Sequence, residues 1–133
     1  MIEDLSIVST LNLINARVKD FVHLEAYIHS FAGNRLTINV GEELIYYYNF
    51  QAVFEDVFMV SMNTSAFLNT RVPWLSIVPA PECFEINRRF RVEIGNTVFQ
   101  LDNEDRLPFF VAAKSISYLP TVGGRPGKPC TLN

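Results

Sequence analysis

Four residues between positions 23 and 29 have side chains of types that can bind ligands or metal ions. His23, Glu25, Tyr27 and His29 are separated by steps of two, a spacing that places side chains on one face of a β-strand. Imidazole nitrogens and a carboxylate are ligands that Zn²⁺ accepts. However, His23 and His29 lie roughly 20 Å apart along a strand, so one ion cannot bind both. An ordinary solvated face is the favoured interpretation; a shallow binding surface without a metal is the alternative.

The run Tyr46-Tyr47-Tyr48 is a second candidate binding surface, because tyrosine is enriched at protein interfaces. A plainer explanation is a strand edge whose tyrosine hydroxyls reach water. Together, the predicted binding residues are His23, Glu25, Tyr27, His29, Tyr46 and Tyr48.

The chain contains no catalytic or cofactor motif that withstands inspection. The segment GGRPGK resembles a phosphate-binding loop, but Lys128 is followed by Pro129 and not by the required Ser or Thr. Cys83 stands between Glu82 and Glu85 instead of beside cations, so we expect a small buried hydrophobic side chain. The spacings of zinc clusters, hydrolase elbows and dinucleotide loops are missing. We therefore predict no catalytic residues, no metal and no cofactor.

A β-hairpin over residues 20–40 would position the first candidate surface. Its two strands alternate, with an apolar face comprising Val22, Leu24, Ala26, Ile28, Leu36, Ile38 and Val40. The outer face adds Thr37 and Asn39 to the histidines, Glu25 and Tyr27. We predict the three-residue loop Ala32-Gly33-Asn34, which pairs Phe31 with Arg35, Ile28 with Ile38 and Ala26 with Val40. This register keeps the apolar side chains on one face.

Residues 3–19 are predicted to form a helix that packs on the sheet. Ile7, Leu11, Ile14 and Val18 follow one another at spacings of four, three and four, which places them on one helical stripe.

A second hairpin is predicted over residues 88–102. Phe90, Val92 and Ile94 alternate with polar residues, and Gly95-Asn96 suits a type II′ turn. The register pairs Ile94 with Thr97, Val92 with Phe99, Phe90 with Leu101 and Arg89 with Asp102.

The remaining segments are mostly strands in our interpretation. Residues 44–54 and the segment that follows, to position 62, favour strands by their aromatic and β-branched content, with a bulge or turn at Glu55-Asp56; a helix is the alternative for 50–62. We also predict a short strand at 72–78, in which Trp74 belongs to the core, and a last strand at 109–119. A short helix is the alternative for 109–118.

Composition predicts one folded domain. The chain has 133 residues, of which 49% are hydrophobic, 13% aromatic and 19% charged, enough apolar surface for a core. We predict a single α+β domain at 1–119, with an N-terminal helix on a curved antiparallel sheet of about six to eight strands. A small closed β-barrel is the alternative. The Pro/Gly-rich residues 120–133 are predicted to form an extended tail.

The charge balance limits the partners. A net charge of −3 argues against nucleic acid, whose phosphates attract clustered Lys and Arg. No apolar run approaches the ~20 residues of a membrane helix, and the acidic start Met-Ile-Glu-Asp is unlike a secretory signal. We expect a cytoplasmic protein in which Cys83 and Cys130 are reduced.

Three functions follow from these observations. The first is a non-enzymatic module that binds another protein, or itself, through a sheet face or an aromatic edge. The second is a small-molecule-binding or enzymatic domain with an aromatic-lined pocket in the curved sheet and a histidine as acid or base. The third is a subunit of a larger bacterial or phage assembly, with the tail as a docking arm.

Overall fold

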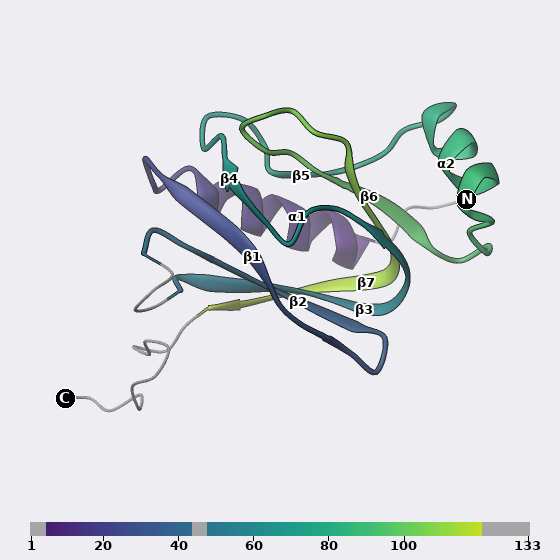
Figure 1. Cartoon of the computed structure of the whole chain (residues 1–133), viewed down its shortest axis with the longest axis horizontal. Coiled ribbons are helices and arrows are strands. Elements are labelled where there is room, and N and C mark those ends of the chain that lie inside the picture. Colours follow the sequence, from purple (N-terminus) through teal and green to yellow (C-terminus); the bar gives the residue numbers. More distant parts are fainter. Residues whose placement is uncertain (1–4, 44–47, 121–133) are drawn as a thin grey trace.

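The computed structural model describes residues 5–43 and 48–120, which form a curled sheet around a helix (Figure 1). In chain order the elements are α1 (Leu5–Val18), β1 (Leu24–Ala32), β2 (Arg35–Gly41), β3 (Phe50–Ser61), β4 (Ser65–Leu68), β5 (Leu75–Ile77), α2 (Glu82–Phe90), β6 (Thr97–Leu101) and β7 (Phe109–Pro120). The strands pair in the order β4-β1-β2-β3-β7-β6-β5, and each pair is antiparallel. The predicted α+β class is confirmed, and the described sheet is open, with β4 and β5 as its edges.

Helix α1 fills the concave side of the sheet. Its predicted stripe, Ile7, Leu11, Ile14 and Val18, is buried in the main core. The helix lies against β7 and β5, and the core residues opposite it come from every strand of the sheet. Complete burial of one aliphatic side chain contributes about 1.5–3 kcal/mol, so this stripe is the main attachment of the helix.

Asn15 adds a polar link between α1 and the edge strand β5. Its Nδ2 donates to the Leu75 carbonyl oxygen at 2.8 Å, and its Oδ1 accepts from the Trp74 and Leu75 N–H groups at 3.0 and 2.9 Å. An edge strand leaves one row of backbone groups unpaired. The Asn15 amide satisfies such groups at the start of β5, so it stands in for a missing neighbouring strand.

The strands of the first hairpin pair as predicted in their central part. Ala26 pairs with Val40 and Ile28 with Ile38. Ala26, Ile38 and Val40 are buried and Ile28 is half-buried. The apolar alternation therefore identified both the strands and the face that packs on α1.

The predicted three-residue loop of this hairpin is wrong. Ala32 pairs with Arg35 and Phe31 with Leu36, which leaves a turn of only Gly33 and Asn34. Both turn residues have positive φ, 60° and 61°, as a type I′ turn requires. That turn matches the right-handed twist of paired strands, which explains why the shorter loop forms.

A β-bulge at His29 reconciles the short turn with the apolar register. The pairing shifts between Ile28 and Ser30, so His29 is the extra residue of β1. The turn is one residue shorter than predicted, and the bulge removes one residue from the pairing. The two differences cancel, and Ile28 and Ala26 keep their predicted partners.

Residues 50–61 and 109–120 form strands β3 and β7, as predicted, not helices. They pair along their length, with a register shift between Val57 and Met59. Asp56, in the predicted bulge, has a positive φ of 51° directly before this shift. Residues 121–133 lie outside the described residues, and Pro120, which we assigned to the tail, is the last residue of β7.

The second predicted hairpin is wrong in its first strand, because residues 82–90 form helix α2. The alternation that we used competes with a helical pattern in which Cys83, Ile86 and Phe90 stand three and four residues apart. Acidic residues occupy the first turn of α2 and basic residues the last, an order that complements the helix dipole. These end charges are the signal that we missed.

Strand β6 exists where the hairpin placed it but has other partners. It pairs with β5 and β7, so the predicted pairs with residues 89–94 do not form, and Ile94 is fully exposed. Its side chains alternate between two cores: Phe99 and Leu101 face the α1 side, whereas Val98 packs with Cys83 and Ile86 of α2 on the opposite side. Cys83 is half-buried there, close to the buried position that we predicted.

Trp74 belongs to the core, as predicted. Its side chain is buried just before the short strand β5. Its ring lies edge-on to Phe50, with the two ring centroids 6.5 Å apart.

Candidate functional site

The two histidines of the predicted binding surface lie at different places, one before β1 and one within it. His23 is exposed immediately before the strand, and its ring lies beside Phe67 of β4, 5.3 Å between centroids. His29 is exposed in the bulge, beyond Tyr27, the last residue of β1 that pairs with β4. Within residues 5–43 and 48–120, no three His, Cys, Asp or Glu side chains are grouped so that they could hold a metal ion.

The outer face of the hairpin is not uniformly solvated, because a row of hydrogen-bonded side chains crosses it. Asn39 Nδ2 donates to the Tyr27 hydroxyl at 3.1 Å, and Gln51 Nε2 donates to Asn39 Oδ1 at 2.8 Å. These residues are direct cross-strand neighbours on β1, β2 and β3. Asn39 is only 1% exposed and Thr37 is also buried, which corrects the solvated interpretation for both.

The remaining predicted binding residues have different outcomes. Glu25 is half-buried and pairs with Phe67 across β1 and β4. Tyr48 is half-buried just before β3, whereas Tyr46 lies outside the described residues. The concave face, where an aromatic-lined pocket was the alternative, holds α1 and the main core.

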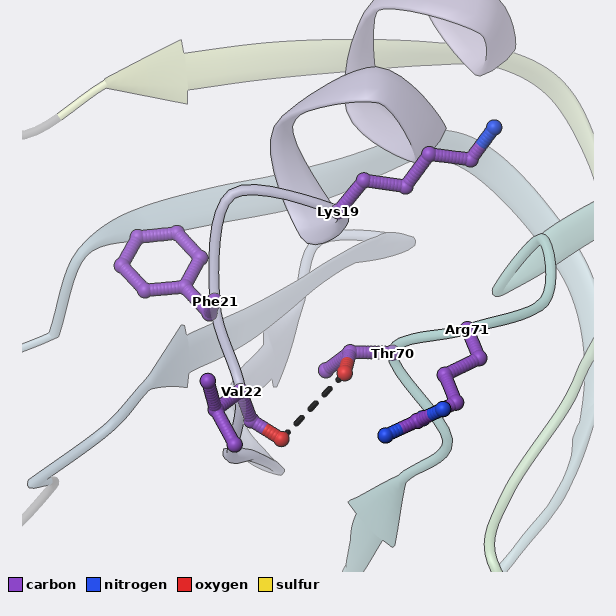
Figure 2. Close-up of a pocket in the computed structure, with 5 residues that line it drawn as sticks. All are labelled: Lys19, Phe21, Val22, Thr70 and Arg71. Carbon is purple, nitrogen blue, oxygen red and sulfur yellow. Dashed lines mark hydrogen bonds between the residues drawn. The ribbon is translucent and has the colours of Figure 1, made fainter.

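A surface pocket of about 330 Å³ lies where the chain passes from α1 to β1 (Figure 2). Lys19, Phe21 and Val22 line it from this connection, and Thr70 and Arg71 line it from the loop after β4. Thr70 Oγ1 donates to the Val22 carbonyl oxygen at 3.2 Å and joins the two sides. Sequence analysis missed this site because the two sides are 48 residues apart in the chain.

Short-range contacts hold the α1 side of the pocket. The Phe21 N–H donates to the carbonyl oxygen of Val18, the last residue of α1, at 3.2 Å. Arg17 lies over the Phe21 ring, 4.5 Å from its centroid, and also pairs with Asp20 at 3.2 Å. Arg17 and Asp20 neutralise one another, so Lys19 is the side chain that gives the α1 side of the pocket its net charge.

The loop side is held by Asn69. Its Oδ1 accepts from the Arg71 N–H at 3.0 Å, and its carbonyl oxygen accepts from the Val72 N–H at 3.4 Å. An asparagine that bonds the backbone two residues later forms an Asx turn. This turn fixes the backbone that carries Thr70 and Arg71.

The charged side chains that line the pocket are both basic. In residues 5–43 and 48–120, Lys19 and Arg71 form no ion pair, and both residues are exposed. Figure 2 shows the Lys19 ammonium and the Arg71 guanidinium extending to opposite sides of the pocket. A pocket beside β5 and β6 instead contains the ion pair of Asp102 and Arg106, 3.5 Å long.

Exposed apolar side chains adjoin this pocket. Val22 is 94% exposed, which corrects our placement of it on the buried face; it lies before the first residue of β1 and therefore escapes the alternation. Phe67 is 45% exposed and contacts His23, the neighbour of Val22 in the chain. We call Lys19, Val22, His23, Phe67 and Arg71 the β1 entry surface.

Among the described residues, no helix has both the length and the apolar character that crossing a membrane requires. Comparison of the chain with protein-family models, with curated proteins and with solved structures finds no match.

Proposed function

We propose that this protein is a non-enzymatic, cytoplasmic protein-binding module that binds another protein through the β1 entry surface. The observation that carries the proposal is that the strongly exposed Val22 lines one pocket with two cations, Lys19 and Arg71. Neither cation forms an ion pair within the described part of the chain. Phe67, 45% exposed, lies beside His23, the residue that follows Val22. His23 and Glu25, two of the residues expected to bind, adjoin Phe67.

The composition of this surface suits protein recognition. Isolated exposed apolar residues are ordinary, but here they adjoin an arginine and an aromatic ring, residue types that are enriched in interfaces. Strand β4 is also an edge of the described sheet. Its Phe67 carbonyl oxygen already accepts from the Glu104 N–H at 2.8 Å, so we assign recognition to the side chains of this surface.

The rigidity of the backbone also supports binding. The bonds from Thr70 to Val22 and from Arg71 to Asn69 hold both sides of the pocket before any partner arrives. Binding costs free energy for each side chain or loop that must be ordered. A surface that is already held in place loses less affinity to this cost.

The test is site-specific photo-crosslinking followed by reconstitution. A benzophenone amino acid replaces Val22 in one sample and Ile94 in another, because both side chains are almost fully exposed. We expect crosslinking from position 22, and not from position 94, to one protein in an extract of the native source. That protein is then identified by mass spectrometry, purified and titrated against the uncrosslinked chain.

Matched substitutions decide the outcome of that titration. We expect Val22→Ser to weaken binding about tenfold, since burial of a valine contributes about 1.5 kcal/mol. Ile94→Ser removes a similar exposed side chain at a distant turn and should leave the affinity unchanged. Equal crosslinking from both positions, or equal affinities of both variants, would refute the proposed surface.

A further inference from the structure

We infer that the β1 entry surface recognises an acidic segment of the partner protein, in which carboxylates flank an apolar side chain. This inference rests on the proposed function and specifies the chemistry of the partner. The carboxylates would bind Lys19 and Arg71 on the two sides of the pocket, and the apolar side chain would lie over Phe21 and Val22.

The charge of the pocket favours a carboxylate ligand. The chain carries a net charge of −3, yet the charged residues that line this pocket are Lys19 and Arg71. The Thr70 hydroxyl donates its proton to Val22, so Lys19 and Arg71 are the side chains left to donate to an anion. An ammonium has three donors, and a guanidinium binds a carboxylate through two parallel bonds.

Two nearby features oppose an anion but are weaker than the two cations. Glu25 pairs with Phe67 across β1 and β4, but it does not line the pocket. Lys19 directly follows the C-terminus of α1, where the helix dipole contributes about half a negative charge. The Arg17–Asp20 pair is neutral. The local balance remains positive, because two full positive charges outweigh this partial negative one.

The shape of the site favours a short peptide segment over a polyanion. The volume of about 330 Å³ is at the small end of ligand pockets, which span about 300–1,000 Å³. Lys19 and Arg71 point to opposite sides in Figure 2, so they suit two separate carboxylates better than one phosphate. In an extended peptide, residues two apart lie on one side of the strand. A sequence acidic–x–apolar–x–acidic therefore places both carboxylates and the apolar side chain on the side that faces the pocket.

The experiment titrates the ¹⁵N-labelled full-length chain with two capped peptides, acetyl-Glu-Ser-Leu-Ser-Glu-amide and acetyl-Gln-Ser-Leu-Ser-Gln-amide. We expect the glutamate peptide to shift the amide signals of Phe21, Val22 and Arg71, and to bind about tenfold more tightly than the glutamine peptide. Lys19→Gln and Arg71→Gln should each weaken binding of the glutamate peptide about threefold, as expected for exposed ion pairs. The double variant should weaken it about tenfold.

Arg89→Gln is the matched control. It removes an exposed arginine from the end of α2, so it changes the net charge equally but not the pocket. Its affinity for the glutamate peptide should equal that of the unmodified chain. Equal binding of the two peptides, no shift of the three amides, or an equal loss in Arg89→Gln would overturn the inference. Tighter binding of inorganic phosphate at the same amides would overturn it as well.

The two proposals fail in different ways. Suppose that Val22→Ser weakens binding of the purified partner while Lys19→Gln and Arg71→Gln do not. The surface then binds a protein, but the inference that it recognises an acidic segment is refuted. If the glutamate peptide binds as expected while Val22→Ser leaves partner affinity unchanged, the pocket binds carboxylates but the proposed protein interface is refuted.

Discussion

Asn15→Ala tests whether a single side chain attaches α1 to the edge of the sheet. The substitution removes the three hydrogen bonds to the backbone of Trp74 and Leu75. Each such bond has a net value of about 0.5–1.5 kcal/mol, and an orphaned buried group costs about 1–3 kcal/mol. Water reaches this half-buried site in part, so we take about 3 kcal/mol for the loss of the three hydrogen bonds together. Alanine returns about 0.6 kcal/mol through its helix propensity, which leaves a destabilisation of about 2–3 kcal/mol.

Asn12→Ala is the matched control, because it is the same substitution on the same helix at an exposed position. It gains the helix propensity without losing a contact to β5, so we expect a slight stabilisation of about 0.5 kcal/mol. The two variants should therefore differ by about 3 kcal/mol.

Urea denaturation followed by tryptophan fluorescence measures this difference. Trp74 is the single tryptophan of the chain, and its own N–H is one of the groups bound by Asn15. For an m-value of about 2 kcal/mol per molar, Asn15→Ala should unfold at a urea concentration about 1 M lower. If the two variants unfold within about 0.5 kcal/mol of each other, the polar link does not stabilise the fold and our reasoning is refuted.

Two further predictions concern the first hairpin. Gly33→Ala should destabilise the chain by about 1 kcal/mol in thermal unfolding, because Gly33 has a φ of +60°. Nothing lies within 4 Å of an added Cβ, so the cost arises from the backbone conformation and not from a clash. Gly33→Asn should cost less, because asparagine adopts positive φ more readily than alanine. An equal cost would argue against backbone strain. Asn39→Ala should lower the free energy of unfolding in urea by about 1–3 kcal/mol, because the Tyr27 hydroxyl and the Gln51 side-chain amide lose their hydrogen bonds to Asn39. The exposed Asn63→Ala is its control, and equal midpoints would refute the role of the row.

The successful predictions rest on repeating patterns that only one structure satisfies. The α1 stripe recurs at a helical period and is buried over its whole length. The alternation of β1 and β2 was strong enough that the fold keeps the apolar pairs even with an unpredicted turn and bulge. Burial of one face and the preferred turn geometry are therefore both satisfied, because the bulge at His29 absorbs the difference between them.

The wrong prediction at 88–94 arose where two patterns overlap. Phe90, Val92 and Ile94 alternate, but α2 ends at Phe90 and leaves Ile94 in solvent. We predicted that residues 88–94 would pair with the strand that follows them. That strand, β6, pairs with β5 and β7 instead. Strand pairing depends on segments far apart in the chain, which a local pattern does not report.

The candidate site was also beyond the reach of local patterns. Lys19, Val22 and Arg71 belong to no motif, and they meet because β4 pairs with the first half of β1. The buried state of Asn39 likewise depends on Tyr27 and Gln51 from the two adjoining strands.

The sequence by itself determined the α+β class, the helix at the start and most strands, because periodic burial of apolar side chains acts along the chain. Only the tertiary structure decided which strands became neighbours, which polar residues were buried, and which charges shared a pocket. These outcomes depend on contacts through space between residues distant in the chain, and the geometry of such contacts is set only when the sheet has curled around α1.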